Sequence, residues 1–337
     1  MPPTDINTEL LEGLPEPAIV VLGQRVLLSN SAARALLGET IDGTPVEAVI
    51  SHPAALEALS GRDQAEDVEL TGLDGSRRYW LMRAAQLGDG TRLVRFVDRS
   101  EARAAEQMRV DFVANASHEL RTPLATLIGY AETLREQAAE IDPATRDRFL
   151  AVVHEEARRM QRVVEDLISL SRIEAEKFTT PTDAVDLAPL IDEATDGVRR
   201  MADERRSDLV RNVERKLPSI AADRSQILQL LENLLTNALR YGEPGTPVTV
   251  SAALEGSMVH LSVSDEGEGI APEHVRRVTE RFYRVDTSRS RSLGGTGLGL
   301  SIVKHIVERH HGRLSIDSTV GRGTTVHVLL PVAERPS

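Results

Sequence analysis

The sequence predicts a multidomain α+β protein with three parts: a small N-terminal α+β domain over residues 14–98, an antiparallel two-helix hairpin over 99–177, and a C-terminal α/β sandwich over 185–333. Short apolar runs separated by Gly-containing turns fill the first hundred residues. A long apolar repeat of helical period follows them, and strand-like and helix-like segments then alternate. A chain of 337 residues is long enough for two or three such domains.

The composition indicates which kinds of partner and which cellular compartment to expect. The net charge is -12, and no Lys/Arg-dense stretch stands clear of acidic neighbours, so we expect no nucleic-acid partner. The absence of cysteine excludes disulfides and thiolate metal sites, which is typical of a cytoplasmic protein. No apolar run approaches the roughly 18–20 residues of a membrane helix. We therefore expect no membrane segment in this chain, which is either a soluble protein or the cytoplasmic portion of a membrane-anchored one.

The N-terminal domain is predicted from its turns. The apolar runs 17–22 and 25–29 flank Gly23-Gln24, which is typical of a hairpin. Residues 30–38 have an Asn at the start and a Gly at the end, as expected for a short capped helix. Three further strand-like runs, separated by Asp-Gly turns at 74–75 and 89–90, predict an antiparallel meander over 66–70, 77–84 and 91–97.

Two long helices are predicted next. The first covers about 100–138, and Asp142-Pro143 begins the second because proline is tolerated at the first helical position. A coiled-coil-like seam follows the second helix, at Val153, Met160, Val163, Leu167 and Leu170. A lone hairpin leaves apolar area exposed, so we expect two copies to pair as a four-helix bundle and form a homodimer. The alternative is that the hairpin packs against other parts of its own chain.

His118 is the residue of the first helix that packing does not explain. The apolar stripe of that helix comprises Val113, Ala116, Leu120, Leu124, Leu127, Ala131 and Leu134. His118 lies about 200° around the helix from Ala116, so we expect the stripe to be buried and the imidazole to point outward. Glu119 can hold one ring N–H and leave the other nitrogen nucleophilic. Thr122 shares the face of His118 and can hold a water, and Pro123 should bend the helix.

Four blocks of the last domain predict a nucleotide site. Asn233 and Asn237 lie four apart on one helix face beside Arg240, a set that can hold Mg²⁺ and phosphate oxygens. An Asp-x-Gly-x-Gly run at 265–269 follows a predicted strand, and its carboxylate can accept the exocyclic N–H of adenine. The glycine-rich run 294–300 precedes a helix, where phosphates bind. The fourth block is the tight turn 321–325, which leads into the final strand.

Together these motifs resemble the sensor histidine kinases. The run from Phe112 to Leu124 is similar to their H-box, and the four blocks are similar to the N, G1, G2 and G3 boxes of the GHKL (Bergerat-type) ATPase fold, with an F box at 281–284. The resemblance covers about two thirds of the chain. It implies that ATP phosphorylates His118 on a ring nitrogen, that Glu119 accepts the ring proton, and that the phosphoryl group passes to an aspartate of a response regulator receiver domain. Thr122 matches the family's phosphatase residue.

The resemblance also implies roles around the nucleotide. Asn237 would ligate Mg²⁺ with Asn233 in support, Asp265 would read adenine, Tyr241 would pack near the base and Arg240 would contact phosphate. The remaining implied residues shape the pocket and its lid: Gly267, Gly269, Gly297, Leu298, Gly299 and Thr324. Residues 283–293, rich in Arg and Ser, would form that lid; Arg284, Arg289 and Arg291 either reach the γ-phosphate or belong to a solvated loop of charges.

The N-terminal domain resembles a PAS sensor domain, through its order of elements and its Asp-Arg-Ser exit at 98–100. With that domain directly before the H-box helix, the chain resembles the phosphate-regulon sensor kinases in particular. Two other classes stay open: a GHKL ATPase that works as a conformational machine, as in gyrase- or MutL-type proteins, and a regulatory module that has lost catalysis. The H-box discriminates against the first, and the intact His118, Asn237 and Asp265 against the second.

Overall fold

The computed structural model describes residues 5–60, 67–73, 75–88, 90–137, 141–176, 179–285 and 295–333. The predicted turn residues Asp74 and Asp89, and the predicted lid residues Arg289 and Arg291, lie outside the described residues. The chain divides into two compact units, Met1–Asp111 and Phe112–Ser337, which we describe separately.

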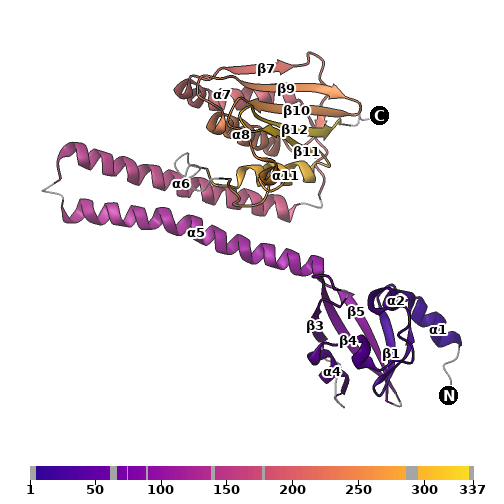
Figure 1. Cartoon of the computed structure of the whole chain (residues 1–337). Coiled ribbons are helices and arrows are strands. Elements are labelled where there is room, and N and C mark those ends of the chain that lie inside the picture. Colours follow the sequence, from indigo (N-terminus) through magenta and orange to yellow (C-terminus); the bar gives the residue numbers. More distant parts are fainter. Residues whose placement is uncertain are drawn as a thin grey trace. The chain divides into compact units, whose positions relative to one another are not determined.

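The first unit contains a five-stranded antiparallel sheet in the order β2-β1-β5-β4-β3 (Figure 1). Its strands are β1 (Ala18–Leu22), β2 (Arg25–Ser29), β3 (Asp67–Thr71), β4 (Tyr79–Gly88) and β5 (Thr91–Asp98). Its short helices are α1 (Asp5–Glu12), α2 (Ser31–Leu37), α3 (Val46–Val49) and α4 (Pro53–Ser60). The five predicted strands are present, while α1 and the bounds of α3 and α4 were not predicted. Buried Ile19, Met82 and Phe96 centre its core.

The predicted Asn cap organises this unit. Asn30 is fully buried, and its Oδ1 accepts hydrogen bonds from the backbone N–H of Ala33 (2.8 Å) and of Ala18 (3.0 Å). Its amide donates to the carbonyls of Leu14 and Glu16. One side chain therefore caps α2 and ties it to the start of the sheet, because an Asn amide can both accept and donate.

The second unit begins within the long helix α5 (Ser100–Glu136), which is followed by α6 (Pro143–Ala175). Asp142 caps α6 by accepting the N–H of Thr145, as predicted. The helix α5 continues through Pro123, which is buried. The expectation that the α5 stripe is buried is wrong for the single chain, because Val113 and Leu124 are 59% and 46% exposed. Helix α5 lies beside α6 on one face (Figure 1), so apolar residues that face away from α6 remain in solvent.

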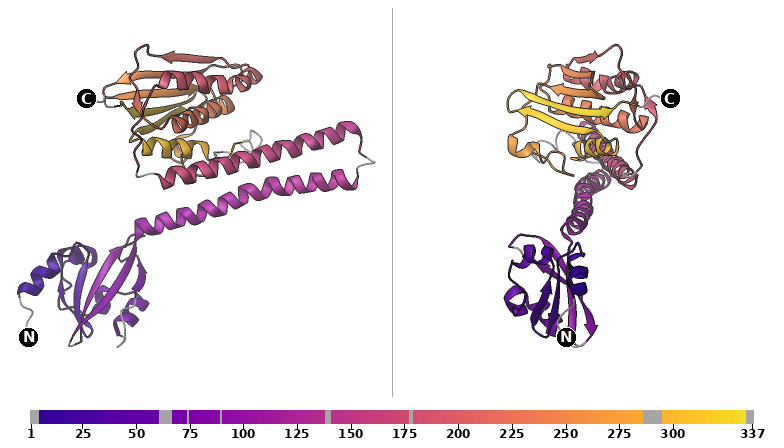
Figure 2. Two further views of the ribbon diagram at one scale, coloured as in Figure 1. Left: turned by 180° about the vertical axis from the view of Figure 1, so that it is seen from behind. Right: turned by 90° about the vertical axis from the view of Figure 1, so that its right-hand side faces the viewer.

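The C-terminal part is a five-stranded sheet in the order β11-β12-β10-β9-β7 with helices on one face (Figure 2). The elements are β6 (Ala184–Val185), α7 (Leu187–Arg205), β7 (Leu209–Val213), β8 (Ile220–Ala221), α8 (Arg224–Tyr241), β9 (Val248–Glu255), β10 (Met258–Asp265), α9 (Pro272–Val275), α11 (Gly299–Arg309), β11 (Arg313–Thr319) and β12 (Gly323–Pro331). The sequence predicts strands over 247–254, 259–265, 313–317 and 324–330, and these correspond to β9, β10, β11 and β12. The strand β7, which pairs parallel to β9 at the sheet edge, was not predicted.

The end of α6 packs into the core of the C-terminal sandwich. Leu170 and Ile173 are buried in the same apolar cluster as the inner faces of α7, α8 and α11. Figure 1 shows α6 running beside α11. Part of the predicted α6 seam is therefore covered by the chain's own sandwich. For this part of the hairpin, the alternative of packing within one chain is correct. The α5–α6 hairpin and the sandwich thus meet directly within one unit.

Candidate functional site

Helix α8 carries the predicted metal and phosphate residues. Its buried face is apolar, with Leu230, Leu231, Leu234 and Leu235 in the core, which fixes the rotation of the helix. Asn233 and Asn237 are half-buried and point toward the start of α11. A Cβ added to Gly299 would lie 3.1 Å from Asn233 Oδ1 and 3.5 Å from Asn237 Nδ2. The structure therefore brings the predicted N-box residues and the predicted G2 glycine together.

Asp265 ends β10 at the same site. Its Oδ1 accepts the N–H of Gly267 at 2.9 Å, and Gly267 forms a bridge with Gly242 at the end of α8. Thr324 pairs with Asp265 in the strand register. Burial raises the pKa of Asp265 to about 6, against the opposing hydrogen bonds from the backbone of Gly267 and Thr324. A carboxylate buried at a strand end and only partly satisfied is suited to accept a hydrogen bond from a ligand.

The glycines allow backbones to approach closely here. A Cβ on Gly267 would collide with the carbonyl of Tyr241. Gly269 has φ +69, and a Cβ there would collide with the carbonyl of Thr319. Gly297 has φ +74 and accepts the N–H of Phe282 at 2.8 Å. These three predicted glycines therefore shape the site through backbone contacts that other residues would prevent.

Arg240 lies at the junction between the site and α6. Burial lowers the pKa of its guanidinium, and the nearby Arg162 and Arg284 act in the same direction, while Asp166 opposes them. The Thr296 hydroxyl donates to Asp166 Oδ2 at 2.7 Å and accepts the N–H of Leu298. Burial raises the pKa of Asp166, and the Thr296 hydrogen bond opposes this. The loop that holds Leu298 and Gly299 is thus tied to the helical hairpin.

His118, Glu119 and Thr122 lie on α5. His118 is exposed, as predicted. The Thr122 hydroxyl donates to the His118 carbonyl in a long contact of 3.4 Å. The Glu119 carboxylate does not hold the ring of His118; instead its Oε2 accepts hydrogen bonds from Arg159 (3.1 Å) and Arg284 (3.0 Å). Two buried arginines compete with the imidazole for this carboxylate, and charge-assisted hydrogen bonds are the stronger ones.

Sequence reasoning missed Arg159 and Asp166. Both lie on α6. The sequence holds one indication for Arg159: it precedes Val163 by four residues and therefore lies on the buried face of the helix. An arginine on an apolar face requires an anionic partner, which here is Glu119. Identifying that partner from sequence requires the register between α5 and α6, which the apolar repeat alone does not fix.

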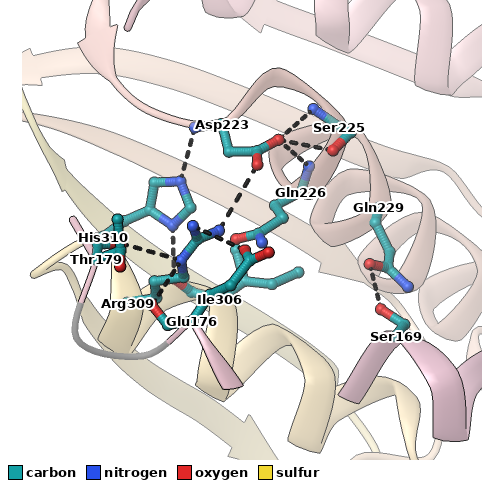
Figure 3. A network of polar contacts seen from close by, with 10 residues as sticks. All are labelled: Ser169, Glu176, Thr179, Asp223, Ser225, Gln226, Gln229, Ile306, Arg309 and His310. Carbon is teal, nitrogen blue, oxygen red and sulfur yellow. Dashed lines mark hydrogen bonds and ion pairs between the residues drawn. The ribbon is translucent and has the colours of Figure 1, made fainter. Parts of the chain in front are cut away.

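A second polar network joins α6 to the sandwich (Figure 3). The buried Arg309 donates to the carbonyls of Glu176 and Thr179 and pairs with the Glu176 carboxylate at 2.9 Å. His310 is 1% exposed, its Nδ1 lies 2.7 Å from the Ile306 carbonyl, and its Nε2 accepts the N–H of Asp223 at 3.0 Å. Because Asp223 caps α8, this network fixes the helix that carries Asn233 and Asn237.

Magnesium fits the oxygen donors of this site. Among the described residues, no group of three or more His, Cys, Asp or Glu side chains could hold a metal ion. The Asn233 amide oxygen and the Asn237 amide group stand beside Gly299, where an added Cβ would crowd them. Mg²⁺ usually takes one or two protein ligands and completes its shell with water and substrate phosphates, which matches so small a set.

Comparison with known families gives two matches. Residues 222–334 match the histidine kinase-, DNA gyrase B- and HSP90-like ATPase, and residues 108–176 match the His Kinase A (phospho-acceptor) domain. The phosphate regulon sensor protein PhoR of Pseudomonas aeruginosa is 34% identical over 299 residues, which cover 88% of this chain and 67% of PhoR. The sensor histidine kinase WalK of Bacillus subtilis is 39% identical over 70% of this chain and 39% of WalK.

The chain therefore belongs to the sensor histidine kinases of two-component systems, and its enzyme class is protein-histidine kinase. The sensor protein SrrB of Staphylococcus aureus, 31% identical over 98% of this chain, matches over 56% of its own length. The fold is shared with histidine kinase ThkA, solved in complex with response regulator protein TrrA, at 19% identity, a TM-score of 0.50 and coverage of 96% of this chain and 98% of ThkA. In the described residues, no helix is long and apolar enough to cross a membrane.

Proposed function

We propose that the chain binds ATP, autophosphorylates His118 and passes the phosphoryl group to an aspartate of a response regulator. The observation that carries this proposal is that an exposed His118 adjoins Glu119, whose carboxylate is already bridged to the ATPase part by Arg284. The phosphoacceptor helix and the nucleotide domain therefore meet within one unit. The ThkA–TrrA complex, a structure of another kinase with a response regulator, supports a receiver domain as the partner.

In the proposed reaction, a nitrogen of His118 attacks the γ-phosphorus of ATP. The N–P bond forms as the bond to the β-phosphate oxygen breaks, and ADP leaves with that electron pair. The displaced ring proton goes to Glu119. Asp265 holds adenine, Arg240 contacts phosphate, and Asn237 with Asn233 would hold Mg²⁺, whose charge neutralises the phosphate oxygens. Catalysis of this type depends mainly on positioning and on charge neutralisation.

The test is incubation of the full chain with γ-labelled ATP and Mg²⁺. We expect an acid-labile, base-stable label that is lost in His118→Ala and in Asn237→Ala. His154→Ala is the matched control, because His154 is an exposed histidine on α6, and it should retain the label. A label that survives in His118→Ala would refute the assignment of the phosphoacceptor.

The assembly and domain roles are part of the same proposal. Apolar side chains exposed on the hairpin, such as Leu124 and Ile128, support pairing of two chains as a four-helix bundle. For the first unit, the strand order β2-β1-β5-β4-β3 with helices between β2 and β3 supports a PAS-like sensor domain over 14–98. The hairpin over 99–177 would carry dimerisation and phosphotransfer, and residues 185–333 catalysis.

The finer proposal is phosphate-starvation signalling in the cytoplasm, where ATP and receiver domains are available. Similarity to PhoR supports it, although WalK and SrrB are similar to a comparable degree. Phosphotransfer profiling tests it: the labelled chain is mixed with each purified response regulator of its source. Preferential transfer to the regulator of phosphate-uptake genes is expected, and preference for another regulator would reassign the input.

A further inference from the structure

Two buried arginines meet beside the proposed phosphoacceptor. The side chains of Arg159 on α6 and Arg284 in the ATPase part are 9% and 5% exposed. Both donate to the same atom, Oε2 of Glu119, at 3.1 Å and 3.0 Å. Their guanidinium groups are thus held close together by a single carboxylate oxygen, although like charges repel. Anions offset this repulsion: Glu119 lies between the two groups, and Glu156 Oε2 lies 3.9 Å from Arg159 Nη1.

Within the described part of the chain, the carboxylate leaves one N–H of each arginine unsatisfied. The Nε–H groups of Arg159 and Arg284 are buried and meet no hydrogen-bond acceptor among the described residues, and the same is true of the neighbouring Arg162. A buried donor without a partner costs stability, so this arrangement calls for an anion with more acceptor oxygens. A guanidinium has five donors in a planar fork, which matches phosphate as well as carboxylate. A phosphoryl group brings three oxygens and nearly two negative charges.

The position of the pair relates it to His118. Glu119 directly follows His118 on α5, and neighbouring Cα atoms lie about 3.8 Å apart. Since Glu119 reaches both arginines, they lie within the reach of a single side chain from the turn of α5 that also carries His118. Arg159 comes from the hairpin, and Arg284 is the last residue of the F-box-like run 281–284, so the pair closes only when hairpin and ATPase part are docked.

We propose that Arg159 and Arg284 form a phosphoryl-binding site which the Glu119 carboxylate occupies in the unmodified chain. This inference rests on the proposed phosphorylation of His118. The phosphoryl group on His118 displaces the carboxylate, so that two buried guanidinium groups hold the modified histidine. The exchange makes and breaks only hydrogen bonds and ion pairs, and the N–P bond is made in the kinase reaction itself. The displaced Glu119 is then free to exchange protons.

The test measures an equilibrium rather than a rate. The full chain is incubated with Mg²⁺ at a fixed ratio of ATP to ADP until the phosphorylated fraction is constant, starting both from unmodified and from phosphorylated chain. Arg159→Gln should lower the equilibrium constant for phosphorylation about tenfold, since it removes charge-assisted hydrogen bonds to the product. Arg158→Gln is the matched control: it removes the same charge from the exposed neighbouring position and should leave the constant unchanged.

A second variant protects the test against misfolding. Arg159→Lys keeps the charge and loses the planar fork, so it should lower the constant by a smaller factor. Loss of a residue that only supports the fold or the reaction rate would leave the phosphorylation equilibrium of the folded protein unchanged. Thermal melting and nucleotide binding measure the folded fraction. If Arg159→Gln and Arg159→Lys both match Arg158→Gln, this inference is wrong. If the unaltered chain takes up no phosphoryl group, the proposed function fails instead.

Discussion

Gly299 lies directly against Asn233: a Cβ at this glycine would stand 3.1 Å from the amide oxygen of Asn233. Gly299 begins α11, whereas Asn233 lies in the middle of α8, so the glycine sets the distance between the two helices at the nucleotide site. A contact this close forces either the amide or the start of α11 to move. The proposed Mg²⁺ and phosphate ligands depend on that space.

The first prediction follows from this contact. Gly299→Ala should raise the Kd for Mg-ATP about tenfold, because overpacking of about 1–3 kcal/mol displaces the amide of Asn233. The fold should persist, since alanine favours a helix. Calorimetric titration measures the Kd. Gly197→Ala on α7, where a Cβ meets nothing within 4 Å, is the control and should bind normally. Equal affinities for the two variants would show that Gly299 does not limit the site.

The second prediction concerns pH and Asp265. Burial raises the pKa of its carboxyl to about 6, so the unliganded protein loses the carboxylate as pH falls through 6. We expect the affinity for ATP to fall several-fold between pH 7.5 and pH 5. The fall should be smaller in Asp265→Asn, where only the titration of the ATP phosphates contributes. Titrations of both proteins across this range measure the difference. Parallel pH profiles would exclude Asp265 as the adenine acceptor.

The ionised Asp265 carboxylate, which favours ATP binding, has the opposite effect on the stability of the fold. A carboxyl whose pKa is raised on folding contributes stability below its unfolded value of 3.8, and that stability is lost as pH rises through about 6. Asp265→Asn should therefore raise the Tm of the nucleotide-free protein at pH 7.5 while weakening its ATP binding. Gain of stability with loss of affinity distinguishes a ligand-binding carboxylate from a structural one.

The sequence predicted individual elements better than the contacts between them. Local chemistry predicts where helices begin and where backbones turn tightly. The helix caps Asn30 and Asp142 and the glycine turns are present in the structure as expected. The partner of Glu119 was not predictable in this way. Arg159 and Arg284 lie 40 and 165 residues away, and only the packed register of α5, α6 and the ATPase part brings them together. The parallel edge strand β7 was missed because its short, largely exposed sequence shows no strong alternation.

The third prediction uses His310, which must be neutral because its Nε2 accepts the N–H of Asp223. Burial lowers its pKa below the usual 6.5. A histidine whose pKa is depressed on folding contributes stability above 6.5 that is lost as pH falls through the folded value. The Tm should therefore drop more between pH 7.5 and 5.5 in the unaltered protein than in His310→Gln. The exposed His154→Gln is the control, and an equal pH response in all three proteins would contradict the prediction.

The fourth prediction separates two activities on one helix turn. The Thr122 hydroxyl makes only a long contact with the His118 carbonyl, so it remains able to hold a water beside the imidazole. Thr122→Ala should leave labelling of His118 intact and slow dephosphorylation of the phosphorylated regulator at least tenfold. Thr122→Ser, which keeps the hydroxyl, should restore the rate. Unchanged regulator dephosphorylation in Thr122→Ala would remove Thr122 from the mechanism.

The fifth prediction concerns the proposed homodimer. Leu124 and Ile128 on α5 are 46% and 49% exposed in the single chain, and burial of each between two copies is worth about 1.5–3 kcal/mol. The double variant Leu124→Glu/Ile128→Glu should convert a dimer into monomers at micromolar concentration, because it replaces that burial with carboxylates. Light scattering measures the mass. Leu87→Glu, which alters an exposed leucine of the first unit, is the control and should remain dimeric. A double variant of unchanged mass would place the dimer interface on another surface.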